Sequence, residues 1–333
     1  MATREERKRL AGETLLVIDT GILPISSQVD MDISSLINES VAETSSYPEL
    51  LSIPQPLPKK KGIQTEFCVL NTTTLGAARD LLIECDDVND DSDDSEVSKK
   101  NDDKQFDERD MKKKKKFLMT EQTPKISVAV LNFASAKNPG GGFRKGSMAQ
   151  EESLALNSAL YACLKDDKMY EYHRNQSNDG LYSDWVIFSP NVPIFRNEID
   201  GSFIEPWPCS IITCPCINKK LEKSNLEGSK KSKMKKQSLS SQRTKSGSEP
   251  QLQKRAKRML RVLAAHHDGH IVLGAWGCGV FGNDPNTIAK IFSDLLRTDE
   301  TFVNRWPKVV FAVLDRSETG RTFQAFKDVF YES

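Results

Sequence analysis

The distribution of apolar and polar residues along the chain predicts strands and helices in alternation. Near-continuous apolar runs are typical of central strands covered on both faces, whereas apolar residues that recur every three or four positions are typical of amphipathic helices. Strands are expected at 65–71, 125–134, 184–195, 209–217, 270–276 and 308–315. Helices are expected at 3–19, 72–82, 150–165, 254–267, 286–297 and 322–330. Thr3 can cap the first helix, because Glu6 follows it at the spacing of a capping box.

Three polar tracts interrupt this pattern. Residues 24–62 are rich in Ser and Pro, and we expect them to form a weakly structured connection. Residues 86–116 are acidic first and basic last, and residues 219–252 are rich in Lys and Ser. Because neither of these last two tracts buries enough apolar surface to offset the entropy lost on ordering, we expect both to be disordered insertions.

The alternation of strands and helices predicts the fold class. It is typical of a three-layer α/β/α domain with a largely parallel or mixed sheet. Predicted strands lie on both sides of each insertion, and neither flank looks self-sufficient. We therefore expect residues 1–333 to form a single α/β domain, in which 1–62 is an N-terminal accessory segment that begins with a helical extension.

The composition narrows the class of protein. The chain has 333 residues, 38% of them hydrophobic, and its 47 basic and 47 acidic residues give a formal net charge of zero. Seven scattered cysteines, an odd number, argue against a disulfide framework, and with four histidines no pattern has the spacing of a zinc site. No signal peptide and no apolar run of membrane-span length is apparent, so we expect a soluble, intracellular protein without membrane association.

Two glycine-rich loops each follow a predicted strand and precede a predicted helix. The first is NPGGGFRKG at 138–146, and the second is GAWGCGVFGN at 274–283. Glycine permits positive φ and lets backbone N–H groups approach an anion, and the N-terminus of the following helix adds a favourable potential. Because ligands of open α/β sheets bind beyond the carboxyl ends of the strands, two such loops indicate a diphosphate, or a phosphate joined to a sugar. The alternative is that each loop is only a tight turn.

The second loop also fits a dinucleotide-binding fingerprint. Gly277, Gly279 and Gly282 match G-x-G-x-x-G, and Asp315 ends the next predicted strand, where a ribose-binding acid could lie. However, that acid follows at more than the usual spacing of about 20 residues, and this interpretation leaves the first loop unexplained. A dinucleotide-binding oxidoreductase is therefore a distant alternative.

A pair of carboxylates follows the first loop. Gln150, Glu151 and Glu152 lie in the first turn of the helix expected at 150–165, where acidic residues commonly complement the helix dipole. Neighbouring helical residues point about 100° apart, so we expect one glutamate to hold a ligand while the other does chemistry. Repulsion between them near a bound diphosphate would raise the pKa of a general acid, as cleavage of a glycosidic bond in a nucleotide sugar requires.

The motif GGG, a short spacer and QEE resembles that of poly(ADP-ribose) glycohydrolases. Its surroundings resemble the microbial (bacterial-like) type in four segments: RLAGETLLVIDTG, LNFASAKNPGGGFRKGSMAQEESL, SPNVPIFR and LGAWGCGVFGNDP. The resemblance runs from about residue 4 to residue 330 and leaves both insertions outside. It implies a macrodomain-like fold with added N-terminal helices. CPCIN at 214–218 departs from the family, which tends to have Ala and Asn near a Pro there; Cys216 is a small replacement.

The resemblance also implies a role for each site residue. Glu152 would protonate the ribose oxygen that leaves from the ribose–ribose bond and would then help to activate water, while Glu151 would hydrogen-bond the ribose. The implied substrate-binding residues are Asn138, Gly140, Gly141, Gly142, Gln150, Gly277, Cys278, Gly279, Val280, Phe281 and Asn283. The three adjacent glycines would pack around the scissile ribose and diphosphate, and the backbone of 277–280 would wrap the diphosphate. No metal and no cofactor is implied.

Some of these residues have plainer alternatives. Phe281 would lie against the terminal ribose and phosphates, but it could also be a core residue. Asn138 would contact a ribose hydroxyl, but it could merely shape a turn before Pro139. Asn283 would support the second loop, but it could be a helix cap.

The leading hypothesis is a poly(ADP-ribose) glycohydrolase that cleaves ribose–ribose O-glycosidic bonds and acts on poly(ADP-ribose) and ADP-ribosylated proteins. The alternatives are a hydrolase of mono-ADP-ribose linkages and a non-catalytic ADP-ribose-binding macrodomain; the intact QEE argues against the latter. We interpret the lysines at 112–116 and 230–236 as solvated rather than as a nucleic-acid interface. The basic stretches 58–61 and 254–258 resemble nuclear import signals, so we expect a nuclear and/or cytoplasmic location.

Overall fold

The computed structural model of the chain describes residues 2–26, 29–87, 127–176, 179–222, 224 and 248–331. The predicted insertions lie mostly outside the described residues, namely at 88–116 and at 225–247. The ends of the second insertion are described: 219–222 form a helical turn, and 248–252 belong to a long helix. The bounds predicted for that insertion are therefore too wide.

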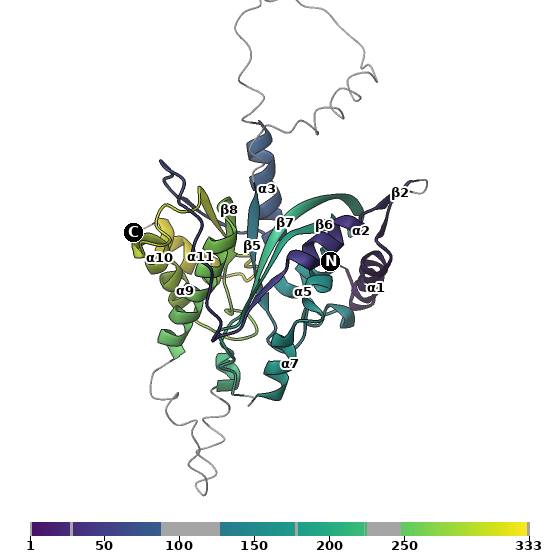
Figure 1. Cartoon of the computed structure of the whole chain (residues 1–333). Helices are drawn as coiled ribbons and strands as arrows, with labels where there is room; N and C mark the ends of the chain where they lie inside the picture. The colour runs from purple at the N-terminus through teal and green to yellow at the C-terminus, as the bar shows by residue number, and fades with distance from the viewer. Residues whose placement is uncertain are drawn as a thin grey trace, which may run out of the picture.

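A seven-stranded mixed sheet forms the centre of the molecule (Figure 1). Its strands are β3 (Ser45–Tyr47), β4 (Glu66–Leu70), β5 (Val128–Ala134), β6 (Val186–Arg196), β7 (Phe203–Pro215), β8 (His270–Gly274) and β9 (Lys308–Ala312). Their order across the sheet is β3-β6-β7-β5-β8-β9-β4. The strands from β7 to β4 in this order run parallel, whereas β6 is antiparallel to both of its neighbours.

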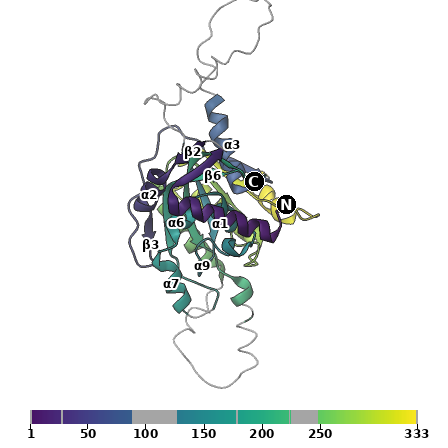
Figure 2. The ribbon, with the colours of Figure 1, turned by 90° about the vertical axis from the view of Figure 1, so that its right-hand side faces the viewer.

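Helices cover both faces of the sheet (Figures 1 and 2). One face carries α9 (Ser248–His266), α10 (Pro285–Thr298) and α11 (Arg321–Tyr331). The other carries α1 (Arg4–Thr20), α2 (Ser34–Glu43), α3 (Thr74–Asp87), α5 (Gln150–Asn157), α6 (Leu160–Leu164) and α7 (Lys168–Asn175). Side chains of β5 alternate between two cores: Ala129 and Leu131 pack toward the first face, and Val128 and Val130 toward the second. The predicted α/β/α mixed-sheet fold is therefore confirmed.

The prediction of a weakly structured connection over 24–62 is wrong for its first half. There β1 (Ile22–Ser26) and β2 (Val29–Asp32) form an antiparallel hairpin, and α2 and β3 follow. The strand β3 joins the main sheet by pairing with β6, and its stability comes from that partner rather than from its own sequence. Residues 48–62, all of them described, contain neither helix nor strand.

The helix predicted over 150–165 is interrupted at Ser158. This residue has extended backbone, with φ of −147°, and forms an isolated bridge to Ile194 of β6. Its hydroxyl donates to the carbonyl of Leu154 over 2.6 Å and accepts the N–H of Leu160 over 3.1 Å. Because serine can replace backbone partners in this way, the chain changes direction between α5 and α6, which apolar spacing alone does not reveal.

Candidate active site

The two glycine loops leave neighbouring strands at the same edge of the sheet. The strand β5 leads into 138–146 and the parallel strand β8 leads into 274–283. The chain then passes to opposite faces, because α5 packs in one core and α10 in the other. Neighbouring parallel strands whose connections diverge in this way open a crevice at their carboxyl ends, which is the usual ligand site of α/β sheets.

The two strands separate before they reach these loops, and Gln150 fills the gap. They pair only over 128–130 of β5. Beyond that point, the side-chain amide of Gln150 donates to the carbonyl of Leu131 over 2.7 Å and accepts the N–H of Phe133 over 2.8 Å. It also donates to Oγ1 of Thr74 over 3.1 Å. Gln150, predicted to bind substrate, thus uses its side-chain amide to attach α5 to β5.

The adjacent glycines turn the first loop back onto the carboxylates. Gly140 and Gly141 have φ of 66° and 60°, in the left-handed region that glycine enters without strain. A Cβ on Gly141 would lie 2.9 Å from Cδ of Glu152 and 3.0 Å from Oε2 of Glu151. Only glycine fits there. Neighbouring helix positions point about 100° apart. The two carboxylates nevertheless converge on one point of the loop, because the ends of the side chains bend toward it.

Each glutamate accepts a backbone N–H group of this loop. Ser135 donates to Oε2 of Glu151 over 2.6 Å, and Gly142 donates to Oε1 of Glu152 over 2.8 Å. Glu151 is 3% exposed, whereas Glu152 is partly exposed. Burial raises the pKa of Glu151 well above its ordinary value and repulsion from Glu152 raises it further, although the hydrogen bond from Ser135 opposes both effects. Oε1 of Glu151 has no hydrogen-bond partner among the described residues.

The N-terminal helix holds the far end of the first loop. Its predicted capping box, Thr3 with Glu6, is present. Nε of Arg7 donates to the carbonyl of Gly146 over 2.9 Å, and Nε of Arg4 donates to the carbonyl beside it over 3.1 Å. Phe143, in the turn after the glycines, is packed in a small core together with residues of α1. The helix α1 is therefore part of the support of the carboxylate site.

The second loop is fastened from inside by Asn283. Gly277 has φ of 74°, and a Cβ there would lie 2.6 Å from Cβ of Cys216 and 2.6 Å from Nδ2 of Asn283. The Asn283 amide, 3% exposed as a residue, donates to the carbonyls of Ile217 over 2.7 Å and of Gly277 over 3.0 Å. The loop is thereby tied to the segment that follows β7, and Cys216 packs beneath it.

The outer part of the second loop is open to a ligand. No atom lies within 4 Å of the position that a Cβ on Gly279 would occupy, and Val280 is 72% exposed. Phe281 is partly buried and lies 6.2 Å from the ring of Tyr182. Burial raises the pKa of the Cys278 thiol to about 12, so the thiol stays protonated at neutral pH. The loop therefore offers its backbone and Phe281 to a ligand rather than a nucleophilic sulfur.

Two acidic residues near this loop serve as helix caps. The carboxylate of Asp284 accepts the N–H of Thr287 at the start of α10 over 2.9 Å, so it occupies the helix terminus at which the sequence predicted a favourable site for phosphate. Asp315 accepts the N–H groups of Thr322 and Phe323 at the start of α11. Hydrogen bonds lower the pKa of Asp315 to about 2. Because this carboxylate is used locally, the structure removes the ribose-binding acid that the oxidoreductase alternative required.

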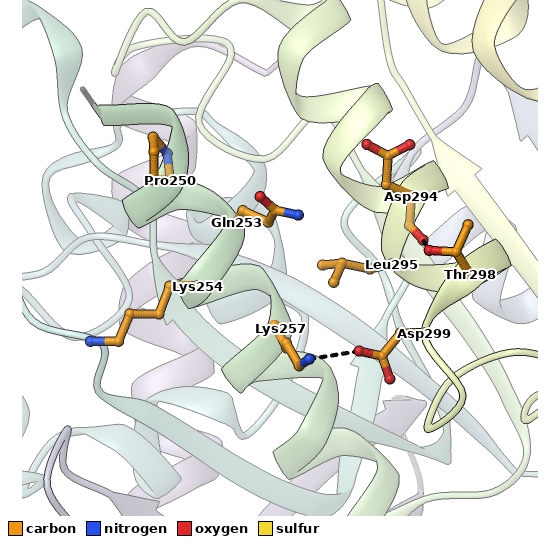
Figure 3. Close-up of a pocket in the computed structure, with 8 residues that line it drawn as sticks. All are labelled: Pro250, Gln253, Lys254, Lys257, Asp294, Leu295, Thr298 and Asp299. Atoms are coloured by element: carbon orange, nitrogen blue, oxygen red, sulfur yellow. Dashed lines mark hydrogen bonds and ion pairs between the residues drawn. The ribbon is translucent and has the colours of Figure 1, made fainter. Parts of the chain in front are cut away.

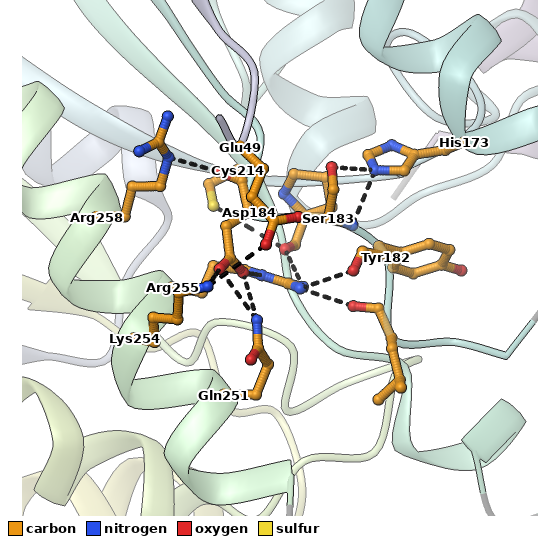
Figure 4. A network of polar contacts seen from close by, with 12 residues as sticks. Glu49, His173, Tyr182, Ser183, Asp184, Cys214, Gln251, Lys254, Arg255 and Arg258 are labelled. Carbon is orange, nitrogen blue, oxygen red and sulfur yellow. Dashed lines mark hydrogen bonds and ion pairs between the residues drawn. The ribbon is translucent and has the colours of Figure 1, made fainter. Parts of the chain in front are cut away.

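Sequence reasoning missed a buried connection between the second loop and the segment that leads into the first. Nδ1 of His173, on α7, lies 3.1 Å from the carbonyl of Ala136. Its Nε2 accepts the N–H of Ser183 over 3.1 Å (Figure 4). Burial lowers the pKa of His173 to about 4, so the ring stays neutral and donates through Nδ1. The ring of Tyr182 lies 5.6 Å from that of His173 and also contacts Phe281. Helical spacing of buried residues could have revealed α7, but not this contact.

A groove elsewhere on the molecule is unrelated to the glycine loops. It lies between α9 and α10 (Figure 3). Its lining consists of Pro250, Gln253, Lys254, Lys257, Asp294, Leu295, Thr298 and Asp299. Lys257 and Asp299 form an ion pair of 2.8 Å across it. None of the predicted site residues lines this groove, so the candidate active site is the crevice between β5 and β8.

The basic stretch 254–258, which resembles an import signal, lies within α9, and the fold uses two of its arginines. Arg255 is fully buried and pairs with Asp184 over 2.8 Å. Arg258 donates to the carbonyls of Asp184 and Pro48.

Among the described residues, none of the helices combines the length and apolar character that a membrane span requires. Within the same residues, no cluster of three or more His, Cys, Asp or Glu is placed to bind a metal ion.

A pair of carboxyl groups is what most glycoside hydrolases use for catalysis. Comparisons with known proteins agree. The family model described as microbial-type PARG, catalytic domain, matches residues 11–197. Among curated proteins, the search found no match. PARG stands for poly(ADP-ribose) glycohydrolase.

Solved structures of this kind align with nearly the whole chain. The poly(ADP-ribose) glycohydrolase of Thermomonospora curvata is 31% identical with a TM-score of 0.73, and the match covers 98% of this chain and 100% of that chain. The same enzyme bound to the inhibitor ADP-HPD is 30% identical with a TM-score of 0.69, covering 97% and 98%. The enzyme of Deinococcus radiodurans in complex with ADP-ribose is 30% identical with a TM-score of 0.62, covering 89% and 97%. The chain therefore belongs to the microbial-type poly(ADP-ribose) glycohydrolases.

Proposed function

We propose that this chain hydrolyses the ribose–ribose O-glycosidic bonds of poly(ADP-ribose) and releases ADP-ribose, with Glu152 as general acid and base. The observation that carries the proposal is the convergence of both carboxylates on Gly141, in the loop that follows β5 and neighbours the glycine loop after β8. The inhibitor and ADP-ribose complexes of the bacterial relatives support an ADP-ribose unit as the ligand.

The protonation of the two glutamates suits a group that acts first as a general acid and then as a general base. Burial, and repulsion from Glu152, raise the pKa of Glu151, which favours a proton shared by the pair over two ionised carboxylates. We assign delivery of that shared proton to Glu152, because it is the more exposed of the two. Glu151, with one oxygen held by Ser135 and the other unpartnered, would bind a ribose hydroxyl.

The reaction then proceeds in two halves. Glu152 gives its proton to the ribose oxygen that leaves, and the bond between that oxygen and the anomeric carbon breaks with development of oxocarbenium character. A water molecule adds to the anomeric carbon, and the Glu152 carboxylate accepts its proton, which restores the starting state. The N–H of Gly142, which donates to Oε1, holds this carboxyl group in place through both halves.

The remaining site residues would bind the rest of the ADP-ribose unit. Backbone N–H groups of 277–280 would surround the diphosphate, Phe281 would lie against the terminal ribose and phosphates, and Asn138, which is exposed, would contact a ribose hydroxyl. We further propose that residues 1–333 act as one macrodomain-related catalytic domain. Poly(ADP-ribose) and ADP-ribosylated proteins would be its partners, in the nucleus and/or cytoplasm.

The test is release of ADP-ribose from labelled poly(ADP-ribose), followed by chromatography, with wild type beside Glu152→Gln and an exposed control, Glu205→Gln on β7. We expect release by wild type and control and none by Glu152→Gln. A wild-type chain that binds ADP-ribose but releases none would be a reader, and one that acts only on mono-ADP-ribosylated protein would support the alternative linkage. Either result would reject the proposed activity.

A further inference from the structure

Tyr182 has a backbone conformation that its side chain disfavours. Among the described residues, three that are not glycine have left-handed φ: Tyr182 at 55°, Asn191 at 48° and Asn304 at 51°. Asparagine enters this region readily because its short polar side chain can bond locally, whereas a bulky aromatic residue there is an outlier. Such strain persists only where the surroundings enforce it, and it is concentrated at functional sites. Backbone preference therefore does not explain an aromatic ring at this position.

Hydrogen bonds hold the backbone on both sides of Tyr182. The buried guanidinium of Arg255 donates to the carbonyls of Leu181 over 2.7 Å and of Tyr182 over 3.2 Å, while it pairs with Asp184. On the other side, His173 accepts the N–H of Ser183 and hydrogen-bonds its hydroxyl over 2.7 Å. Figure 4 shows these contacts around a common centre. A buried ion pair and a buried imidazole thus hold one strained residue in place.

The ring that this network positions is not itself part of the network. In Figure 4 the side chain of Tyr182 points away from the Asp184–Arg255 pair. It is partly exposed, and it lies against Phe281 of the second glycine loop with ring centroids 6.2 Å apart. On its other side it meets His173, whose Nδ1 contacts the carbonyl of Ala136, two residues ahead of the first loop. The ring therefore lies beside the second loop and is linked through His173 to the segment that leads from β5 into the first loop.

We propose that Tyr182 is a substrate-contacting residue, which forms with Phe281 an aromatic wall against the ribose and diphosphate of the bound ADP-ribose unit. This inference rests on the proposed function. Apolar ring faces pack well against the C–H face of a sugar. Because the ring is already fixed in the free protein, no free energy of binding is lost to ordering it. Arg255 and His173 are then positioning residues, which act through Tyr182.

The test uses variants that remove the ring and relieve the strain. Tyr182→Asn and Tyr182→Gly both suit left-handed φ, so we expect them to fold. We expect about tenfold weaker ADP-ribose binding and about a tenfold rise in KM, with kcat within about threefold of wild type. Tyr182→Phe keeps the ring and should bind as wild type does. The matched control is Tyr172→Ala, which removes a 42% exposed ring beside His173 that does not contact Phe281.

Two further outcomes keep the inference separate from the proposed function. If wild type releases ADP-ribose and Tyr182→Asn binds and turns over equally well, the inference is overturned while the proposed function stands. If wild type neither binds nor cleaves, the proposed function fails first. Should both ring-deletion variants fail to melt cooperatively, NMR of ring-labelled tyrosines in wild type decides, with the Tyr182 signal identified by Tyr182→Phe. A shift of that signal on addition of ADP-ribose supports the inference, and an unmoved signal rejects it.

Discussion

The backbone of Gly141 lies directly against the carboxylate of Glu152, so that a Cβ on the glycine would come within 2.9 Å of the carboxylate carbon. The same point lies 3.0 Å from Oε2 of Glu151. The loop therefore sets the position of both acids, and the site tolerates no side chain between them.

Replacement of Gly141 by alanine should abolish catalysis. The substitution places a methyl group on the Glu152 carboxylate and forces alanine into left-handed φ, which costs roughly 1–2 kcal/mol of stability. We expect a loss of kcat/KM of at least about a hundredfold. Gly62→Ala is the matched control, because Gly62 has φ of 77° but nothing within 4 Å of its Cβ position. Equal activity losses in both variants would show that strain alone, not the carboxylate contact, is responsible.

The buried Glu151 should make stability depend on pH. Because the pKa of Glu151 is raised, the folded chain keeps a proton there that the unfolded chain releases near the ordinary glutamate pKa of about 4.3. This contribution is complete below that pH and is lost as pH rises through the folded pKa. Glu151→Gln cannot ionise, so its Tm should rise relative to that of wild type as the pH increases above the ordinary glutamate pKa of about 4.3. Thermal melts across this range measure the difference.

The matched control for this pH experiment is Glu205→Gln, an exposed position on β7. Its Tm should stay at a constant offset from that of wild type. Parallel curves for Glu151→Gln and wild type would contradict the buried, proton-binding state of Glu151.

Removal of the Gln150 side chain should destabilise the fold. Gln150→Ala leaves the carbonyl of Leu131 and the N–H of Phe133 without the partners that replace strand pairing between β5 and β8. Unpaired buried backbone groups cost about 1–3 kcal/mol each, so for two such groups we expect a loss of about 2–6 kcal/mol in the free energy of unfolding. Denaturant titration measures it, with the exposed Gln253→Ala on α9 as control. A loss below about 0.5 kcal/mol, typical of a surface change, would exclude this fastening role.

Loss of the Arg7 side chain should lower activity more than stability. Arg7→Ala removes the hydrogen bond to the carbonyl of Gly146 and loosens the end of the first loop. We expect kcat/KM to fall about three- to tenfold, with a small change in Tm. Arg9→Ala is the control, because Arg9 lies on the same helix and pairs with Glu13 instead of the loop. Steady-state kinetics on poly(ADP-ribose) would distinguish the two; equal values would argue against a positioning role for α1.

The sheet and most helices could be predicted because their stability follows local patterns. The apolar run at β5 and the helical spacing at α10 each report burial directly, and the capping box at Thr3 is a purely local device. The elements that were missed depend on partners distant in sequence. The three residues of β3 form a strand because β6 lies beside them, and Ser158 breaks a helix because Ile194 is within reach.

The site shows the same division. The two glycine loops and the glutamates are visible in sequence, because closely spaced glycines follow two of the predicted strands and QEE follows the first loop within a short spacer. That Gln150 fastens a strand, and that His173 and Tyr182 link the second loop to the segment ahead of the first, depends on which strands separate and where α7 packs. No spacing rule in a single sequence contains that information.

Because the chain diverges after β5 and β8, two segments that are distant in sequence form the two sides of the crevice. The family model ends at residue 197, so the matched span carries both carboxylates but only one wall. The opposite wall, 274–283, begins 77 residues after the end of that span, and Arg4 and Arg7 lie ahead of it. We therefore expect a polypeptide trimmed to 11–197 to keep both carboxylates but to lose the second loop and the contacts of Arg4 and Arg7, and so to bind substrate poorly.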